Sequence, residues 1–123
     1  MILVDTSVWI DHFRQGDLEL TSLLNSGKVL SHRFVIGEIA LGNIQNRKII
    51  LGTLQNLPQS TIASDEEVLH FIERYSLFGS GLGYIDAHLL ASTLLSPGSL
   101  LWTRDKRLLA ETARLGVCVN LTP

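Results

Sequence analysis

The sequence is poor in the features that would place a protein outside a reducing compartment. It has a single cysteine, Cys118, which cannot form a disulfide within the chain. No apolar run approaches the roughly 20 residues of a membrane-spanning helix. The first apolar segment reaches Asp5 with no basic residue before it, which does not fit a secretory signal. We therefore expect a cytoplasmic protein without a membrane segment.

An excess of charge of one sign is also missing. The 10 Lys and Arg residues and 12 Asp and Glu residues give a formal net charge of -2, so the chain lacks the basic character of many nucleic-acid-binding proteins. Arg104, Lys106 and Arg107 form a short basic cluster that predicts only a local basic rim. With 123 residues, 46% of them hydrophobic, the chain is expected to form one globular domain over 1–123.

Several motifs of known chemistry are absent. The chain has no G-x-x-x-x-G-K-S/T phosphate loop, and its GSGLG segment follows a predicted helix instead of a strand, unlike a dinucleotide-binding turn. Its four histidines have no metal-ligand spacing, so a zinc site is not expected. The carboxylates are left as the candidate functional groups.

Short apolar segments alternate with longer helical patterns along the chain. Parallel strands need helical crossovers, so this alternation predicts an α/β fold: a three-layer α/β/α sandwich with a short central parallel sheet. Gly, Pro and polar turns mark the expected boundaries. Strands are expected at 1–4, 29–30, 60–63, 99–103 and 117–119, and helices at 6–13, 18–27, 34–44, 47–57, 65–79, 84–95 and 104–116.

Two acids follow predicted strands, and a third opens a predicted helix. Asp5 comes directly after the first strand, and Asp105 lies one residue beyond the strand 99–103. The carboxyl ends of parallel strands meet at one edge of a sheet, which draws these two side chains together. Asp86 lies in the first turn of the helix at 84–95. Taken singly, each of the three acids is explained equally well as a helix cap or by a helix dipole.

Glu38 lacks such an explanation. Its neighbours one helical turn away are Phe34, Val35, Leu41 and Gly42, and none of them is basic. A glutamate in the middle of an apolar helix is costly unless it is paired or binds a cation. A helix less buried than its composition suggests, or a distant arginine, is the alternative.

Four carboxylates at one edge would repel one another and raise each other's pKa values unless a cation neutralised them. Oxygen ligands without paired His or Cys favour Mg²⁺ or Mn²⁺ over zinc. Such a centre suits phosphoryl chemistry with a metal-activated water. Thr6, Ser7 and Thr103 are candidates to orient a carboxylate or a water, and each is also a candidate capping hydroxyl.

The segments MILVDTSVWIDHF, FVIGEIALG, GLGYIDAHLLAS and LLWTRDKRL resemble, in order and spacing, the PIN-domain nucleases, in particular the VapC toxins of bacterial toxin–antitoxin pairs. The similarity extends over nearly the whole chain. It implies a small α/β/α sandwich whose acidic site binds Mg²⁺ or Mn²⁺ and cleaves RNA. Carried over by position, it implies that Asp5, Glu38, Asp86 and Asp105 are the metal-binding and catalytic acids.

The resemblance also implies a homodimer that a cognate VapB-type antitoxin holds inactive, with a tail in the acidic groove and often an arginine at the carboxylates. Arg104, Lys106 and Arg107 are then candidate RNA contacts. The leading hypothesis is a metal-dependent endoribonuclease toxin. Three alternatives stay open: a PIN nuclease that processes RNA without being a toxin, a phosphotransferase or phosphatase with Asp5 as nucleophile, and a non-catalytic partner-binding module whose acids are caps.

Overall fold

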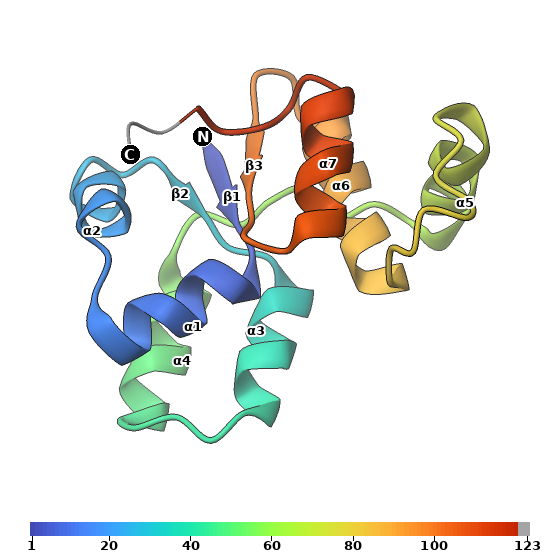
Figure 1. Ribbon diagram of the computed structural model, residues 1–123. Coiled ribbons are helices and arrows are strands. Elements are labelled where there is room, and N and C mark those ends of the chain that lie inside the picture. The colour runs from blue at the N-terminus through green and yellow to red at the C-terminus, as the bar shows by residue number, and fades with distance from the viewer. Residues whose placement is uncertain (121–123) are drawn as a thin grey trace.

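A computed structural model describes residues 1–120 as alternating short strands and helices (Figure 1). Strand β1 lies in the middle of a three-stranded sheet of order β2-β1-β3 and pairs in parallel with both neighbours. The elements are β1 (Ile2–Val4), α1 (Thr6–Gln15), α2 (Leu18–Asn25), β2 (Val29–Leu30), α3 (Arg33–Leu41), α4 (Arg47–Asn56), α5 (Asp65–Arg74), α6 (Tyr84–Leu95), β3 (Leu100–Trp102) and α7 (Lys106–Arg114).

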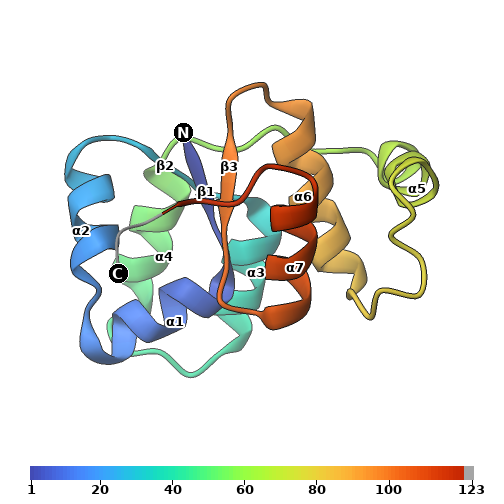
Figure 2. The same cartoon turned by 45° about the horizontal axis from the view of Figure 1, so that its top comes forward.

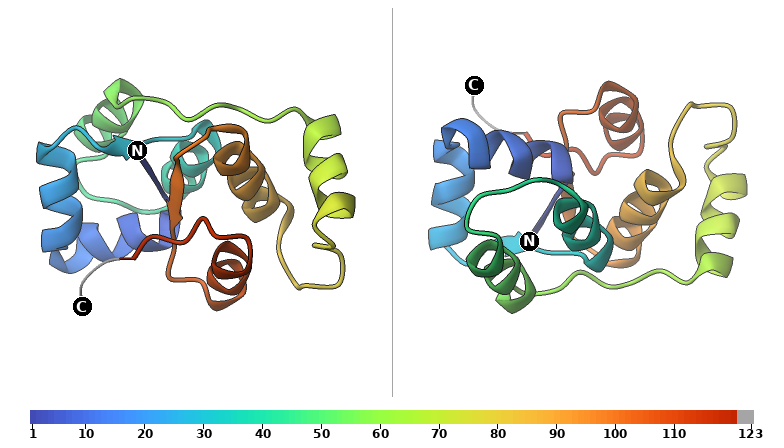
Figure 3. Two further views of the ribbon diagram at one scale, coloured as in Figure 1. Left: turned by 90° about the horizontal axis from the view of Figure 1, so that it is seen from above. Right: turned by 90° about the horizontal axis from the view of Figure 1, so that it is seen from below.

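Helices cover both faces of the sheet. Seen from above, α3, α4 and α6 lie on one side and α1 and α7 on the other, with α2 and α5 at opposite ends (Figure 3, left). Strands β1 and β3 run side by side between these layers (Figure 2). Leu3, Val4 and Leu101 are fully buried, as expected for strands that are apolar on both faces. The fold is therefore the predicted three-layer α/β/α sandwich with a short parallel sheet.

The strand predicted at 60–63 is wrong. Only Gln59 forms a bridge, to Ser31. The backbone N–H of Ser31 donates to Pro58 O (2.8 Å), and that of Ser60 donates to Ser31 O (2.7 Å). The pairing stops there because the partner segment turns into α3 directly afterwards, so residues 60–63 have no strand beside them to extend the ladder.

The strand predicted at 117–119 is also wrong. Cys118 forms a single bridge with Leu101, and Leu101 N–H donates to Val117 O (2.8 Å). Strand β3 offers only three residues for pairing. One bridge is therefore all that the end of the described chain forms with it.

Five helices are shorter than predicted, and two of them, α3 and α5, end three or more residues early. Helix α3 ends at Leu41 instead of residue 44, and the Arg47 guanidinium donates to the free carbonyls of Ala40 and Gly42 at its end. Helix α5 ends at Arg74 instead of residue 79, because Ser76 has a φ of 53°, outside the helical region.

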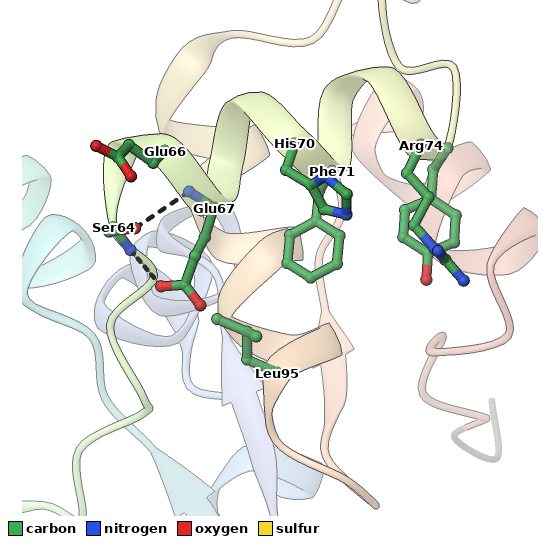
Figure 4. Close-up of a pocket in the computed structure, with 8 residues that line it drawn as sticks. Ser64, Glu66, Glu67, His70, Phe71, Arg74 and Leu95 are labelled. Carbon is green, nitrogen blue, oxygen red and sulfur yellow. Dashed lines mark hydrogen bonds between the residues drawn. The ribbon is translucent and has the colours of Figure 1, made fainter.

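Helix α5 begins with a capping box. Ser64 Oγ accepts the backbone N–H of Glu67 (3.1 Å), and Glu67 Oε1 accepts that of Ser64 (2.9 Å) (Figure 4). Asp65, predicted to head this helix, is its first residue.

Among residues 1–120, no helix has the length and apolarity needed to cross a bilayer.

Candidate active site

Asp5 lies where β1 runs into α1, at the carboxyl edge of the sheet. Its backbone N–H donates to Trp102 O of the neighbouring β3 (2.9 Å), and the residue is only 4% exposed. It occupies the cap position of α1, but its side chain accepts no backbone N–H of that helix. Ser7 Oγ (2.7 Å) and Thr103 Oγ1 (2.8 Å) both donate to its Oδ2 instead. The carboxylate is therefore oriented by hydroxyls and is not used as a cap.

Thr103 connects Asp5 to the acid at the other strand end. The hydroxyl oxygen of Thr103 accepts the backbone N–H of Asp105 (3.1 Å). Asp105 is a true cap, because its Oδ1 accepts the N–H of Leu108 in α7 (3.0 Å). One carboxylate oxygen suffices for this cap, so the other oxygen of this exposed side chain remains available to a ligand.

Glu38 reaches from α3 to the start of α1. Thr6 Oγ1 donates to Glu38 Oε1 at 2.8 Å, which joins two segments 32 positions apart. Within residues 1–120, no Lys, Arg or His lies within ion-pair distance of Glu38. The proposed alternative of a distant arginine partner does not hold for the described chain.

Asp86 lies half-buried in the first turn of α6. Burial raises its pKa, and the negative charges of Asp5, Asp105 and Glu38 raise it further, to about 6, while the backbone N–H of Gly83 acts in the opposite direction. Charges affect one another in this way only over short distances. The four predicted acids therefore lie around one region at the carboxyl edge of the sheet.

The four carboxylates surround this region without converging on a point. In the described part of the chain, no three carboxylate, imidazole or thiol groups are close enough to enclose a metal ion as they stand. Figure 1 shows the N-terminal ends of α1, α6 and α7 at this edge of the sheet, with α3 beside them.

The three basic residues around Asp105 have different surroundings. Arg104 pairs with Asp11 (2.7 Å) and with Asp17, and its guanidinium lies 5.6 Å from the centre of the Trp102 ring. Arg107 Nη1 donates to a carbonyl of the loop before α6 (3.2 Å). Lys106 is exposed and makes no hydrogen bond or ion pair within residues 1–120. A role for the three in RNA binding stays a prediction.

A buried polar network between α3, α5 and α6 was not predicted. His32 Nδ1 accepts a backbone N–H of α3 (3.0 Å) and its Nε2 lies 3.1 Å from Ser92 Oγ. Burial, followed by the charges of His88 and Arg33, lowers the pKa of His32 to about 4, so it is neutral. His88 Nε2 lies 3.0 Å from Asp65 Oδ1. His32 caps α3, and its place two residues before the helix predicted at 34–44 is the one sequence feature near this role.

A groove of about 500 Å³ on α5 lies apart from the acids. Its lining includes the acidic Glu66 and Glu67, the basic His70 and Arg74, and the ring of Phe71 (Figure 4). None of the four candidate acids contributes to it. The acidic region at the sheet edge, and not this groove, is the candidate active site.

An α/β/α sandwich with carboxylates gathered at the strand ends is the architecture of a PIN domain. The PIN-domain family model matches residues 2–115, and the chain belongs to this family. Two relatives are Ribonuclease VapC32 of Mycobacterium tuberculosis, from strain CDC 1551 / Oshkosh and from strain ATCC 25618 / H37Rv. Each is 49% identical to this chain over 119 residues, which cover 97% of this chain and 96% of the relative.

Proposed function

We propose that this chain is a metal-dependent endoribonuclease and the toxin of a VapBC-type toxin–antitoxin pair. The observation that carries the proposal is the hydroxyl network at the carboxyl edge of the sheet, in which Thr103 bonds to both Asp5 and Asp105 and Thr6 bonds to Glu38; the charges of these acids also raise the pKa of Asp86. This region belongs to a PIN-domain chain that is 49% identical to a protein named as a ribonuclease. Asp5, Glu38, Asp86 and Asp105 are the metal-binding and catalytic acids in this proposal.

The donor set fits a hard divalent cation. It consists of carboxylate oxygens, and no Lys, Arg or His of residues 1–120 forms an ion pair with any of the four acids. Such donors suit Mg²⁺ or Mn²⁺. When bound, the cation supplies a water of lowered pKa and stabilises negative charge on the phosphoryl oxygens.

The hydroxyls of the chain orient the proposed ligands. Ser7 and Thr103 hold Oδ2 of Asp5, and Thr6 holds Oε1 of Glu38. Each hydrogen bond fixes one carboxylate oxygen and leaves the second free to face the cation. Without a cation the acids repel an RNA phosphodiester, so cleavage is expected to depend fully on added metal.

We further propose RNA as substrate, a VapB-type antitoxin as protein partner, and a homodimer. An apolar groove of about 250 Å³ between α1, α2 and α4 supports a docked segment of the antitoxin, because it is lined mainly by Trp9, Phe13, Leu24, Ile50 and Leu54. The unneutralised carboxylates favour an arginine of the antitoxin as a second contact.

The test is incubation of purified, antitoxin-free protein with structured RNAs and Mg²⁺ or Mn²⁺. We expect products with 5′-phosphate and 3′-hydroxyl ends, and no cleavage in the presence of a chelator. Asp5→Asn keeps the shape of the side chain but removes its charge, and it should be inactive. If wild type and Asp5→Asn behave alike and neither cleaves RNA, the proposed function is wrong.

A further inference from the structure

A second, smaller cavity lies beside the acidic region. We call it the glycine-loop pocket; it has a volume of about 210 Å³ and is formed by the loop before α6 and the residues on which that loop packs. Its lining residues are Ile72, Leu77, Phe78, Gly79, Ser80, Gly81, Leu82, Gly83, Tyr84 and Ala87. Its position and its chemistry both suggest a role beyond shaping the loop.

The pocket borders Asp86, and its loop is bound to the helix that Asp105 caps. Gly83 caps α6, and a Cβ atom at this position would lie 3.7 Å from Oδ2 of Asp86. On the other side, Arg107 Nη1 donates to Gly81 O (3.2 Å), and Arg107 follows Asp105 by two residues. The loop is thus fixed between α6 and α7, and Gly83 in its lining places the pocket next to Asp86.

The chemistry of the lining fits an uncharged planar group. Among residues 1–120, no Asp, Glu, Lys or Arg lines the pocket, so it offers no charged side chain to a phosphate or a cation. Two aromatic rings are accessible, because Phe78 is 63% and Tyr84 is 49% exposed. Tyr84 is held in place by its hydroxyl, which donates to Asp65 Oδ1 (2.8 Å), and by the His88 ring, 4.7 Å away and nearly perpendicular. A pre-oriented exposed ring loses little entropy when a ligand stacks on it.

The loop backbone is also suited to close approach at one position. Gly79 and Gly81 have φ values of +73° and +85°, which other residues rarely adopt. At Gly79 the space that a side chain would take is open, so its peptide group can approach the edge of a flat ligand, whereas at Gly81 that space is taken by the Arg107 side chain. The groove on α5 offers a poorer surface for RNA, since it carries the two carboxylates Glu66 and Glu67.

We propose that the glycine-loop pocket receives an unpaired base of the RNA, adjacent to the cleaved phosphodiester, which stacks on Phe78 and Tyr84. The inference rests on the proposed function, because a phosphodiester at the acids brings its neighbouring base to this loop. Unpaired bases of RNA loops and single strands are available for such stacking, whereas paired bases are not. The pocket then directs cleavage to unpaired RNA.

The test combines protein and substrate changes on a single-stranded oligoribonucleotide whose cleavage site has first been mapped with wild type. Phe78→Ala is expected to raise KM about tenfold, equivalent to about 1.4 kcal/mol, with kcat changed less than twofold. An abasic nucleotide beside the cleaved bond should raise KM of wild type by a similar factor, and should cost Phe78→Ala little more. Leu18→Ala is the matched control, since Leu18 is an 88% exposed apolar side chain on the distant α2.

Binding is measured separately in the Asp5→Asn background, with single-stranded oligonucleotides that carry one 5-iodouridine, placed at each position in turn, for photo-crosslinking. We expect a crosslink to Phe78 or Tyr84, mapped by tandem mass spectrometry. If wild type cleaves RNA but Phe78→Ala behaves like Leu18→Ala, or if the crosslink forms only elsewhere, the proposed base-binding pocket is wrong. The proposed nuclease activity is unaffected by this result. A crosslink to these rings without any cleavage by wild type overturns the nuclease and supports the pocket. Neither cleavage nor a crosslink overturns both.

Discussion

Asp86→Asn is expected to stabilise the metal-free protein at neutral pH while it abolishes cleavage. Burial and the charges of Asp5, Asp105 and Glu38 raise the pKa of Asp86 from the ordinary 3.8 to about 6. At neutral pH the folded chain therefore holds this side chain ionised in surroundings that oppose its charge. Asparagine has nearly the same shape and carries no charge, so the substitution removes this cost.

The magnitude follows from the size of the pKa shift. A rise from 3.8 to about 6 is equivalent to about 3 kcal/mol, and solvent screening of this half-buried group reduces the expected gain to about 1–2 kcal/mol. The folded state binds the proton more tightly than the unfolded state does. The destabilisation is therefore complete above the folded pKa of about 6, decreases as the pH falls through 6, and is absent below the unfolded pKa of 3.8.

The measurement is urea unfolding of wild type and Asp86→Asn with a chelator, at about pH 8 and about pH 4. We expect the variant to be more stable at the higher pH and equal to wild type at the lower. Added Mg²⁺ should stabilise wild type more than the variant. Glu66→Gln, which removes an exposed acid from the first turn of α5, is the control and should give no gain. A variant no more stable at pH 8, or a gain that persists at pH 4, would refute the reasoning.

Three further predictions concern the groups that surround the acids. Thr103→Val removes two hydrogen bonds of a buried hydroxyl and should lower both kcat and the free energy of unfolding, by about 1–3 kcal/mol for the latter, whereas Thr103→Ser should retain most of both. Glu38→Gln should weaken Mn²⁺ binding in calorimetry by more than tenfold, and Thr6→Val by a smaller factor, because Thr6 only orients the glutamate. Asp17→Asn releases one ion pair of Arg104; we expect kcat to fall at unchanged RNA affinity, whereas tighter RNA binding would indicate that Arg104 contacts RNA once freed.

The proximity of Asp5 to the acids near β3 was predictable, because it depends only on the topology of the sheet. Any parallel sheet brings the carboxyl ends of its strands to one edge, whatever the lengths of the connections. The start of α6, and with it the place of Asp86, was predictable to the residue because glycines precede it and Ser96-Pro97-Gly98 follows it. Glycine and proline residues at the helix boundaries, together with a general rule of sheet topology, were sufficient to predict these elements.

The remaining features depend on partners that a local pattern does not contain. Residues 60–63 have the composition of a strand, but a strand needs a neighbour, and the neighbouring chain turns into α3 at Arg33. The spacing of Glu38 within its helix predicts an unusual environment but not that Thr6 holds it. The ion pairs of Arg104 with Asp11 and Asp17 likewise join residues about 90 positions apart. Each requires knowledge of how the layers pack.

Three helix N-termini explain how the chain tolerates four carboxylates in one region. Asp5 and Asp105 lie at the cap positions of α1 and α7, and Asp86 lies in the first turn of α6. Each helix N-terminus contributes about half a positive charge, roughly 1.5 charges for the three, against four negative charges when all four acids are ionised. The uncompensated remainder of roughly 2.5 negative charges slightly exceeds the two positive charges that one divalent cation supplies. At Asp105 a helix cap and a proposed metal ligand are therefore the same residue, whereas Asp5 takes the cap position of α1 without capping it. The helix ends offset part of the charge of the acids, and the remaining charge favours a bound cation in the proposed site.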